Sequence, residues 1–201
     1  MRFAAARFRP AFGRVLSVVI VAIAATGLVG FIVTNDWAGL GRYSWGLILL
    51  GTLAVALFFL PYLDVAEEEI TVRNVLTTVH IPWQSIERID TKYALTLYTN
   101  QGTIAVWASP APSRYAGQVS AHRDVTLAAA DQGGSIRPGD LLSSASGAAA
   151  FVIRQHWNDL RDDGLLDSAG TANAGYRREI HWVTIGVVTA LAIATALGAL
   201  L

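Results

Sequence analysis

The four histidines have the broadest chemistry in this chain, because imidazole can bind a metal or transfer a proton near neutral pH. They are His80, His122, His156 and His181. None has carboxylates at the helical or hairpin spacing that a zinc site requires. The chain has no cysteine, which excludes thiolate nucleophiles, disulfides and cysteine metal sites. We therefore expect no metal and no cofactor.

Other catalytic patterns are also incomplete. The triplet His122-Arg123-Asp124 has the letters of a kinase catalytic loop, but Ala129 stands where that loop has its asparagine. No glycine-rich phosphate loop and no serine nucleophile elbow occurs. The run Glu67–Glu69 is more simply a solvated spacer than a metal site. The sequence therefore predicts that this protein is not an enzyme.

Four side chains outside the apolar runs are candidates for binding. Arg73, Arg88 and Lys92 could form a local basic patch, which an anionic lipid headgroup requires. Trp107 is predicted to face away from the apolar side of its strand and to contact a partner. The segment Asp64–Glu179 has ten basic and fourteen acidic side chains, a net charge of −4, so solvated surface charge is the simpler interpretation of the cations.

Three further residues are predicted to be structural. Trp83 follows a proline at a predicted turn and is expected in the core or at a sheet edge. Trp157 lies on the apolar face of a predicted helix and is expected in the core. Asn74 follows a predicted strand, and we expect it to serve a turn.

Three long apolar runs determine how these residues are presented. They are Val15–Val33, Ser44–Leu63 and Trp182–Leu201, each of 19 or 20 residues. As helices they are about 28–30 Å long, which matches a bilayer core of roughly 30 Å. Charged residues make up only 15% of the chain, so we predict three transmembrane helices and contact with the lipid bilayer. No run has an ionisable residue at its centre, which argues against a transporter or channel.

Basic residues near the runs predict the orientation. Four arginines precede the first run, whereas the connection Asn35–Tyr43 contains only Arg42, and Arg177 and Arg178 stand just before the third run. The positive-inside rule then places the N-terminus and the polar segment in the cytoplasm and the C-terminus outside the plasma membrane. A cleaved signal peptide is the alternative for the first run, but the run continues nine residues past Ala24, so we expect an uncleaved anchor.

The third run has a regular stripe of small residues. Gly186, Ala190, Ala194 and Gly198 recur every four residues and share one helix face. Such a face lets another helix approach closely, and this kind of packing drives association in lipid. Packing within the three-helix bundle is the simplest interpretation. Homo-oligomerisation and docking to another membrane protein are the alternatives.

Residues 65–109 have the alternation of a small antiparallel sheet with five short strands. Ile70 and Val72 alternate with polar residues, and Pro82 is expected to end a strand or lie on an edge. Asn100-Gln101-Gly102 is typical of a hairpin turn.

A predicted helix follows the sheet, between two linkers. Its apolar stripe is Ala149, Val152, Ile153, His156, Trp157 and Leu160. This spacing is that of an amphipathic helix over residues 148–166, with Gly164 as its C-terminal cap. We expect the stripe to cover the open face of the sheet, with attachment to the membrane surface as the alternative. Residues 1–14 are a basic N-terminal segment, residues 110–147 a flexible linker, and residues 167–179 a second linker.

Two short motifs carry a family resemblance. Ile70-Thr71-Val72-Arg73-Asn74 and the later Ile81-Pro82-Trp83, with the hairpin that ends at Val106-Trp107-Ala108, resemble the bacterial PH-like domain family. More narrowly, they resemble actinobacterial membrane proteins of the low-molecular-weight protein antigen 6 type. The resemblance covers roughly half the chain and implies a PH-like sheet capped by a helix, without catalytic residues. A complete PH barrel has seven strands, two more than we count, and the third apolar run is additional to the simplest members.

The combined prediction is an α+β membrane protein with three transmembrane helices and a PH-like sheet packed by one amphipathic helix. Its leading function is that of a non-enzymatic, membrane-anchored module that recruits a protein or lipid in the cytoplasm. The alternative is a structural or accessory subunit of a larger membrane complex, docked through the third transmembrane helix. No nucleic-acid partner is expected.

Overall fold

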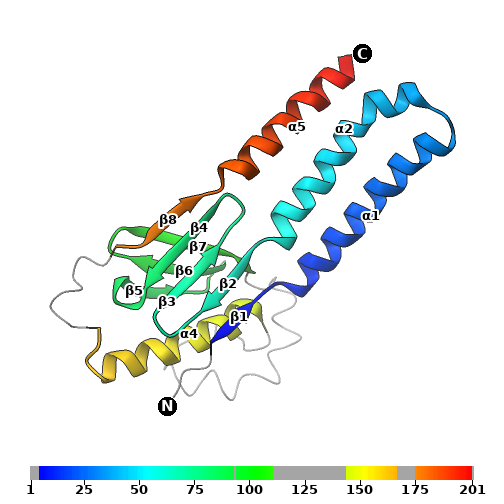
Figure 1. The fold of residues 1–201 in the computed structure, drawn as a ribbon. Helices are drawn as coiled ribbons and strands as arrows, with labels where there is room; N and C mark the ends of the chain where they lie inside the picture. The colour runs from blue at the N-terminus through cyan, green and yellow to red at the C-terminus, as the bar shows by residue number, and fades with distance from the viewer. Residues whose placement is uncertain (1–4, 93, 111–143, 167–174, 201) are drawn as a thin grey trace. The chain divides into compact units, whose positions relative to one another are not determined.

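The computed structural model of the chain describes residues 5–92, 94–110, 144–166 and 175–200. These residues fall into two compact units. One contains three long helices and the short turn of residues 75–77, and the other contains two β-sheets and a shorter helix (Figure 1). Nearly all of the predicted linker 110–147, and most of the predicted linker 167–179, lie outside the described residues.

The first unit contains three helices that are long and apolar enough to cross a membrane. They are α1 (Ala11–Val33), α2 (Trp37–Ala54), which continues as the π-helical turn η1 (Val55–Phe59), and α5 (Trp182–Leu200). Helix α2 packs against both α1 and α5. The three helices confirm the membrane part of the predicted fold class.

Helix α2 begins at Trp37, well before the predicted start at Ser44. Asp36 is its N-cap, since its side chain accepts a hydrogen bond from the Gly39 amide at 2.8 Å. Asn35, with φ of 54°, turns the chain sharply after α1. The hydropathy pattern missed this first part of the helix because its polar residues dilute the apolar run. The two helices are therefore joined by a tight turn, not by the predicted nine-residue connection.

The end of this helix also differs from the prediction. In η1 the Leu60 amide donates to the Val55 carbonyl at 3.0 Å, five residues back. Pro61 follows and has no amide hydrogen to continue the helix. The last two residues of the predicted span, which ended at Leu63, belong to a strand instead. An apolar strand directly after an apolar helix extends the hydrophobic run, so composition alone could not separate them.

The second unit contains two sheets. In sheet A the strand order is β1-β2-β3-β4-β8, and in sheet B it is β5-β6-β7. Sheet A is built from β1 (Ala6–Phe8), β2 (Tyr62–Val65), β3 (Glu69–Arg73), β4 (Thr77–Pro82) and β8 (Arg177–Ile180). Sheet B follows the short helix η2 (Trp83–Ser85) and is built from β5 (Ile86–Asp90), β6 (Ala94–Thr99) and β7 (Gly102–Pro110). Every pairing with a described register is antiparallel.

The five strands predicted for residues 65–109 are β3 to β7, and the unit has three more strands that were not predicted. Strand β2 was assigned to the second membrane span, and β1 and β8 fell in segments predicted as a basic tail and a linker. Strand β8 is fully exposed and mostly charged, and β1 has only three residues, so neither has the alternation that identifies a strand. Both lie at the edges of sheet A (Figure 1).

The two sheets and one helix share a single hydrophobic core. Its fully buried members include Leu63, Ile70, Ile81, Leu95, Leu97 and Val106. Helix α4 (Ala145–Asp162) contributes Ala149, Ala150 and Ile153 to the same core, which confirms the predicted packing of an amphipathic helix on the sheet. Helix α4 therefore covers one side of the core that the two sheets share.

Local chemistry determines where α4 begins and ends. The Ser144 hydroxyl accepts from the Gly147 amide at 2.9 Å and caps the N-terminus. Gly164, with φ of 70°, ends the helix as predicted. The Leu165 amide then bonds to the Leu160 carbonyl at 3.0 Å, which is the hydrogen bond of a Schellman motif.

Candidate functional site

The outer face of sheet A displays the side chains that point away from the core. Tyr62 stands directly opposite Arg73, and Asp64 stands directly opposite Arg7. Between them along β2, Leu63 is fully buried. The alternation of the strands therefore brings residues from β1, β2 and β3 onto one exposed surface.

Three arginines surround Tyr62 on this face. The guanidinium carbons of Arg7, Arg9 and Arg73 lie 4.1, 5.4 and 5.9 Å from the centre of its ring. Arg73 Nε is buried and has no hydrogen-bond partner. Asp64 lies 3.8 Å from Arg7. We refer to Arg7, Arg9, Tyr62 and Arg73 as the Tyr62 cluster.

Sequence reasoning identified only Arg73 of this cluster. Arg7 and Arg9 are two of the four arginines that were used to predict orientation, and Tyr62 was included in the second apolar run, Ser44–Leu63. An alternating Arg-x-Arg directly before the first membrane helix was the available signal, because alternate residues of a strand share one face. It was missed since no strand was predicted there.

The outer face of sheet B presents a different set of candidates. Arg88 and Tyr98 are cross-strand partners, and the guanidinium lies 3.9 Å from the ring centre. Trp107, on the edge strand β7, is 54% exposed, in agreement with its predicted outward direction. Lys92 is exposed beside β5, where its backbone amide donates to Asp90 Oδ1 at 3.1 Å.

The structure does not support one basic patch formed by Arg73, Arg88 and Lys92. Arg73 ends β3 in sheet A, whereas Arg88 is in β5 of sheet B and Lys92 follows β5; neither arginine is part of the shared core. Each arginine stacks on a different tyrosine. Hairpin register decides which residues meet, and the order of residues along the chain could not reveal it.

Both residues of the family motifs that were predicted to be structural form specific contacts. Asn74 links the end of β3 to the backbone of β7, through Ala105 and Trp107, so its role extends beyond a turn. Trp83 is 1% exposed, and its indole nitrogen donates to the Ala66 carbonyl at 3.1 Å. Asn74 therefore connects the two sheets, and Trp83 connects η2 to the loop between β2 and β3.

Trp83 also packs against a buried histidine. His156 of α4 meets the indole edge-on with ring centres 4.7 Å apart, and its Nε2 lies 3.4 Å from the Glu67 carbonyl oxygen. Trp157, the neighbouring aromatic residue, is partly buried against the core, and Arg161 lies over its ring. These contacts fix α4 to the loop between β2 and β3.

The described histidines do not form a metal centre. His80 Nδ1 lies 2.8 Å from Glu69 Oε1 and 3.2 Å from Thr71 Oγ1, all on the outer face of sheet A. His181 contacts the Val75 carbonyl. Across residues 5–92, 94–110, 144–166 and 175–200, no group of three metal-binding side chains occurs. His122 and the kinase-like triplet lie outside these ranges.

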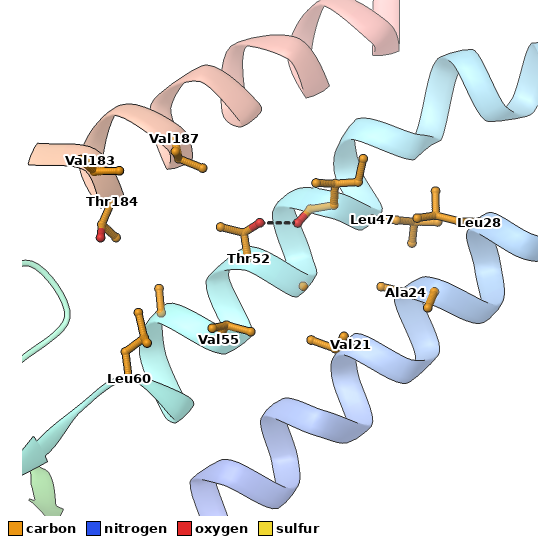
Figure 2. Close-up of a pocket in the computed structure, with 14 residues that line it drawn as sticks. Val21, Ala24, Leu28, Leu47, Thr52, Val55, Leu60, Val183, Thr184 and Val187 are labelled. Carbon is orange, nitrogen blue, oxygen red and sulfur yellow. Dashed lines mark hydrogen bonds between the residues drawn. The ribbon is translucent and has the colours of Figure 1, made fainter. Parts of the chain in front are cut away.

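The helical unit contains an apolar groove of about 490 Å³ (Figure 2). Helix α1 contributes Val21, Ala24 and Leu28, and α5 contributes Val183 and Val187. Thr52 of α2 also lines it, but its hydroxyl donates to the Ile48 carbonyl at 2.8 Å. A groove of this chemistry between helices of membrane-spanning length suits hydrocarbon and offers no reacting group.

The small-residue stripe of α5 changes environment along its length. A Cβ placed on Gly198 would lie 2.9 Å from the Arg42 carbonyl oxygen of α2. A Cβ placed on Gly186 would have no neighbouring atom within 4 Å. The C-terminal end of the stripe therefore packs within the bundle, while Gly186 stays open.

Comparison with known families identifies the segment that contains most of the sheet residues. Residues 61–141 match the family described as Bacterial PH domain, which within the described part of the chain spans β2 to β7. No curated protein and no solved structure matches the chain significantly. The narrower resemblance to the antigen 6 type stays a prediction. The matched segment, about two fifths of the chain, is thus similar to the bacterial PH domain family.

Proposed function

We propose that the chain is a non-enzymatic, membrane-anchored module that recruits a protein partner through the outer face of sheet B. PH domains are in general binding modules without catalytic residues, and here such a domain lies between helices that are long enough to cross a bilayer. The observation that carries the proposal is the exposed Trp107 on an edge strand. Arg88, stacked on Tyr98, lies on the outer face of the same sheet.

The residue types on this face support a protein partner. Tryptophan, tyrosine and arginine are the residues most enriched among those that dominate protein interfaces. A tyrosine that holds an arginine in place also lowers the entropy that the arginine side chain loses on binding. Lys92, exposed at the end of β5, adds a second cation at the rim. An acidic or aromatic surface is the chemistry that would match.

We place this module in the cytoplasm. Strand β1 precedes α1 and pairs with β2, which follows α2. Pairing requires both strands to be on the same side of the membrane, which agrees with two crossings between them. The arginines before α1 and α5 favour the cytoplasmic side, and the C-terminus is then outside.

Affinity purification of the full chain in mild detergent tests this function. The variant Trp107→Ala combined with Arg88→Glu and Lys92→Glu should lose a co-purifying protein. The matched control is Arg177→Glu, an exposed arginine of the edge strand β8 in sheet A, which should retain it. Retention of the same protein by the triple variant would refute the proposed surface.

A second candidate function is docking to another membrane protein through α5. The open environment of Gly186 favours it, because a small exposed residue permits close approach of a helix. Gly186→Leu should then abolish co-purification of a membrane partner while the bundle stays intact. Unchanged co-purification in this variant would exclude docking at this end of α5.

A further inference from the structure

The Tyr62 cluster concentrates positive charge on one small area of sheet A. All three guanidinium carbons lie within 6 Å of the same ring centre, so no two are more than about 11 Å apart. Asp64 is the carboxylate that pairs with the cluster, through Arg7. The four charged groups together have a net charge of +2. Like charges this close repel one another unless an anion lies between them.

In the sequence, two members of the cluster lie close to the ends of two of the three long helices. Arg9 directly precedes Pro10, the N-cap of α1, and Tyr62 directly follows Pro61, where the second helix has ended. Arg9 and Tyr62 are therefore two and three residues away from the ends of segments of membrane-spanning length. Tyrosine and arginine at such positions are typical of the headgroup region of a bilayer.

Charge is also polarised along strand β2. Tyr62 stands at its start, whereas Glu67 and Glu68 come after its end, so an extended strand of roughly 13 Å separates them. Glu69 is engaged with His80. The described strand places Glu67 and Glu68 at the far end from residue 61.

We propose that the Tyr62 cluster binds the phosphate group of an anionic phospholipid headgroup in the adjoining leaflet. Arg7 and Arg9 supply exposed guanidinium donors, and the buried, unpartnered Nε of Arg73 supplies a further one. The ring of Tyr62 holds the three side chains in place by cation–π contact. Arg7 and Arg9 lie outside the segment matched to the PH family, so this site is a feature of the whole chain. It does not depend on the partner surface of sheet B.

The test is a lipid titration of the full chain in nonionic detergent micelles, followed by calorimetry. The probes are short-chain phosphatidylglycerol, phosphatidylcholine with the same chains, and inorganic phosphate. We expect phosphatidylglycerol to bind, phosphatidylcholine not to saturate, and inorganic phosphate to bind at least tenfold more weakly. Binding should weaken as ionic strength rises, because salt screens the exposed arginines.

Variants define the site. Arg7→Gln with Arg9→Gln should weaken phosphatidylglycerol binding roughly 25-fold, since about 1 kcal/mol per basic residue near an anionic surface is about fivefold in affinity. Asp64→Asn should strengthen it by roughly fivefold for the same reason. Arg88→Gln is the matched control, because it removes the same kind of arginine–tyrosine stack from sheet B, and it should change binding less than about twofold.

Three results would overturn the proposal. If phosphatidylglycerol and phosphatidylcholine bind equally well, the site does not select an anionic headgroup. If Arg88→Gln weakens phosphatidylglycerol binding as much as the Arg7 and Arg9 replacements do, the effect comes from net charge and not from the Tyr62 cluster. Inorganic phosphate that binds as tightly as phosphatidylglycerol, and competes with it, identifies a free-anion site instead of a lipid site. Arg7 and Arg9 are exposed, so their replacement leaves the core intact and each result can be interpreted. The affinity purification that tests the sheet B surface is a separate experiment, so failure of one proposal can be distinguished from failure of the other.

Discussion

The side chain of Asn74 holds the backbone of Trp107. Asn74 Oδ1 accepts a hydrogen bond from the Trp107 amide at 2.9 Å, and Asn74 Nδ2 donates to the Ala105 carbonyl at 2.8 Å. Asn74 directly follows β3 of sheet A, while β7 is an edge strand of sheet B. One amide thus makes the pair of bonds that a neighbouring strand would make. It occupies part of an edge that could otherwise pair with another chain.

Replacing Asn74 should loosen this edge. Asn74→Ala removes both hydrogen bonds, and we expect a loss of about 1–2 kcal/mol in the free energy of unfolding. Asn74→Asp keeps an acceptor for the Trp107 amide but sets a carboxylate against the Ala105 carbonyl, so it should not restore stability. Hydrogen–deuterium exchange of the Trp107 amide is the direct measurement.

The control for this change is Asn100→Ala, in the exposed turn between β6 and β7. It should leave exchange at Trp107 unchanged. Equal protection of that amide in wild type and Asn74→Ala would show that the side chain does not hold the strand.

Trp83 should be the most sensitive single position of the core. Trp83→Phe keeps most of the ring but leaves the Ala66 carbonyl without its donor, with an expected cost of about 1–3 kcal/mol. Trp83→Ala also opens a cavity and should cost about 3–5 kcal/mol. Thermal unfolding followed by circular dichroism measures both. Trp107→Phe, at an exposed position, should stay within about 0.5 kcal/mol of wild type, and a larger loss there would contradict the assignment of Trp83 as the core tryptophan.

The packing of α5 on α2 can be tested by a disulfide. A Cβ on Gly46 would lie 3.5 Å from Thr195 Cγ2, and the chain has no cysteine of its own. Gly46→Cys with Thr195→Cys should therefore cross-link under mild oxidation in isolated membranes. Adding Gly198→Leu should reduce the cross-link several-fold, because its side chain collides with the backbone of α2. Gly186→Leu should leave it unchanged, and a cross-link that is indifferent to both would argue against the packing.

The turn between α1 and α2 yields a fourth prediction. Asp36→Ala removes the N-cap of α2 and should cost about 1 kcal/mol. Asn35→Gly should be neutral or slightly stabilising, whereas Asn35→Val should cost roughly 1–2 kcal/mol, because a β-branched residue is strained at a positive φ. Melting temperatures in detergent measure all three. A tolerated valine would show that the chain does not need this conformation.

Elements whose apolar residues form a long run or recur at a regular spacing were predictable from the sequence. The membrane helices followed from hydropathy, and the face of α4 with its cap at Gly164 followed from the spacing of its apolar residues. Trp107 was correctly predicted to be exposed, since its neighbours alternate in burial. In each case the information lies within one local segment.

Contacts between distant segments could not be predicted in this way. Arg9 and Tyr62 are separated by two membrane helices, and their meeting depends on the register of β1 against β2. The separation of Arg73 from Arg88 depends on which hairpin joins which sheet. Asn74 reaches β7 through a tertiary contact that no local pattern signals. These are the relationships that define the candidate sites.

The connections between sheet A and the three long helices are very short. One or two residues separate β1 from α1, η1 from β2, and β8 from α5. Along the chain, the edge strand β1 comes before α1, and the other edge strand, β8, comes just before α5. Sheet A can therefore be completed only after β8, and so after both α1 and α2, has been synthesised. Connections this short keep β1, β2 and β8 each within two residues of a helix that is long enough to cross a membrane.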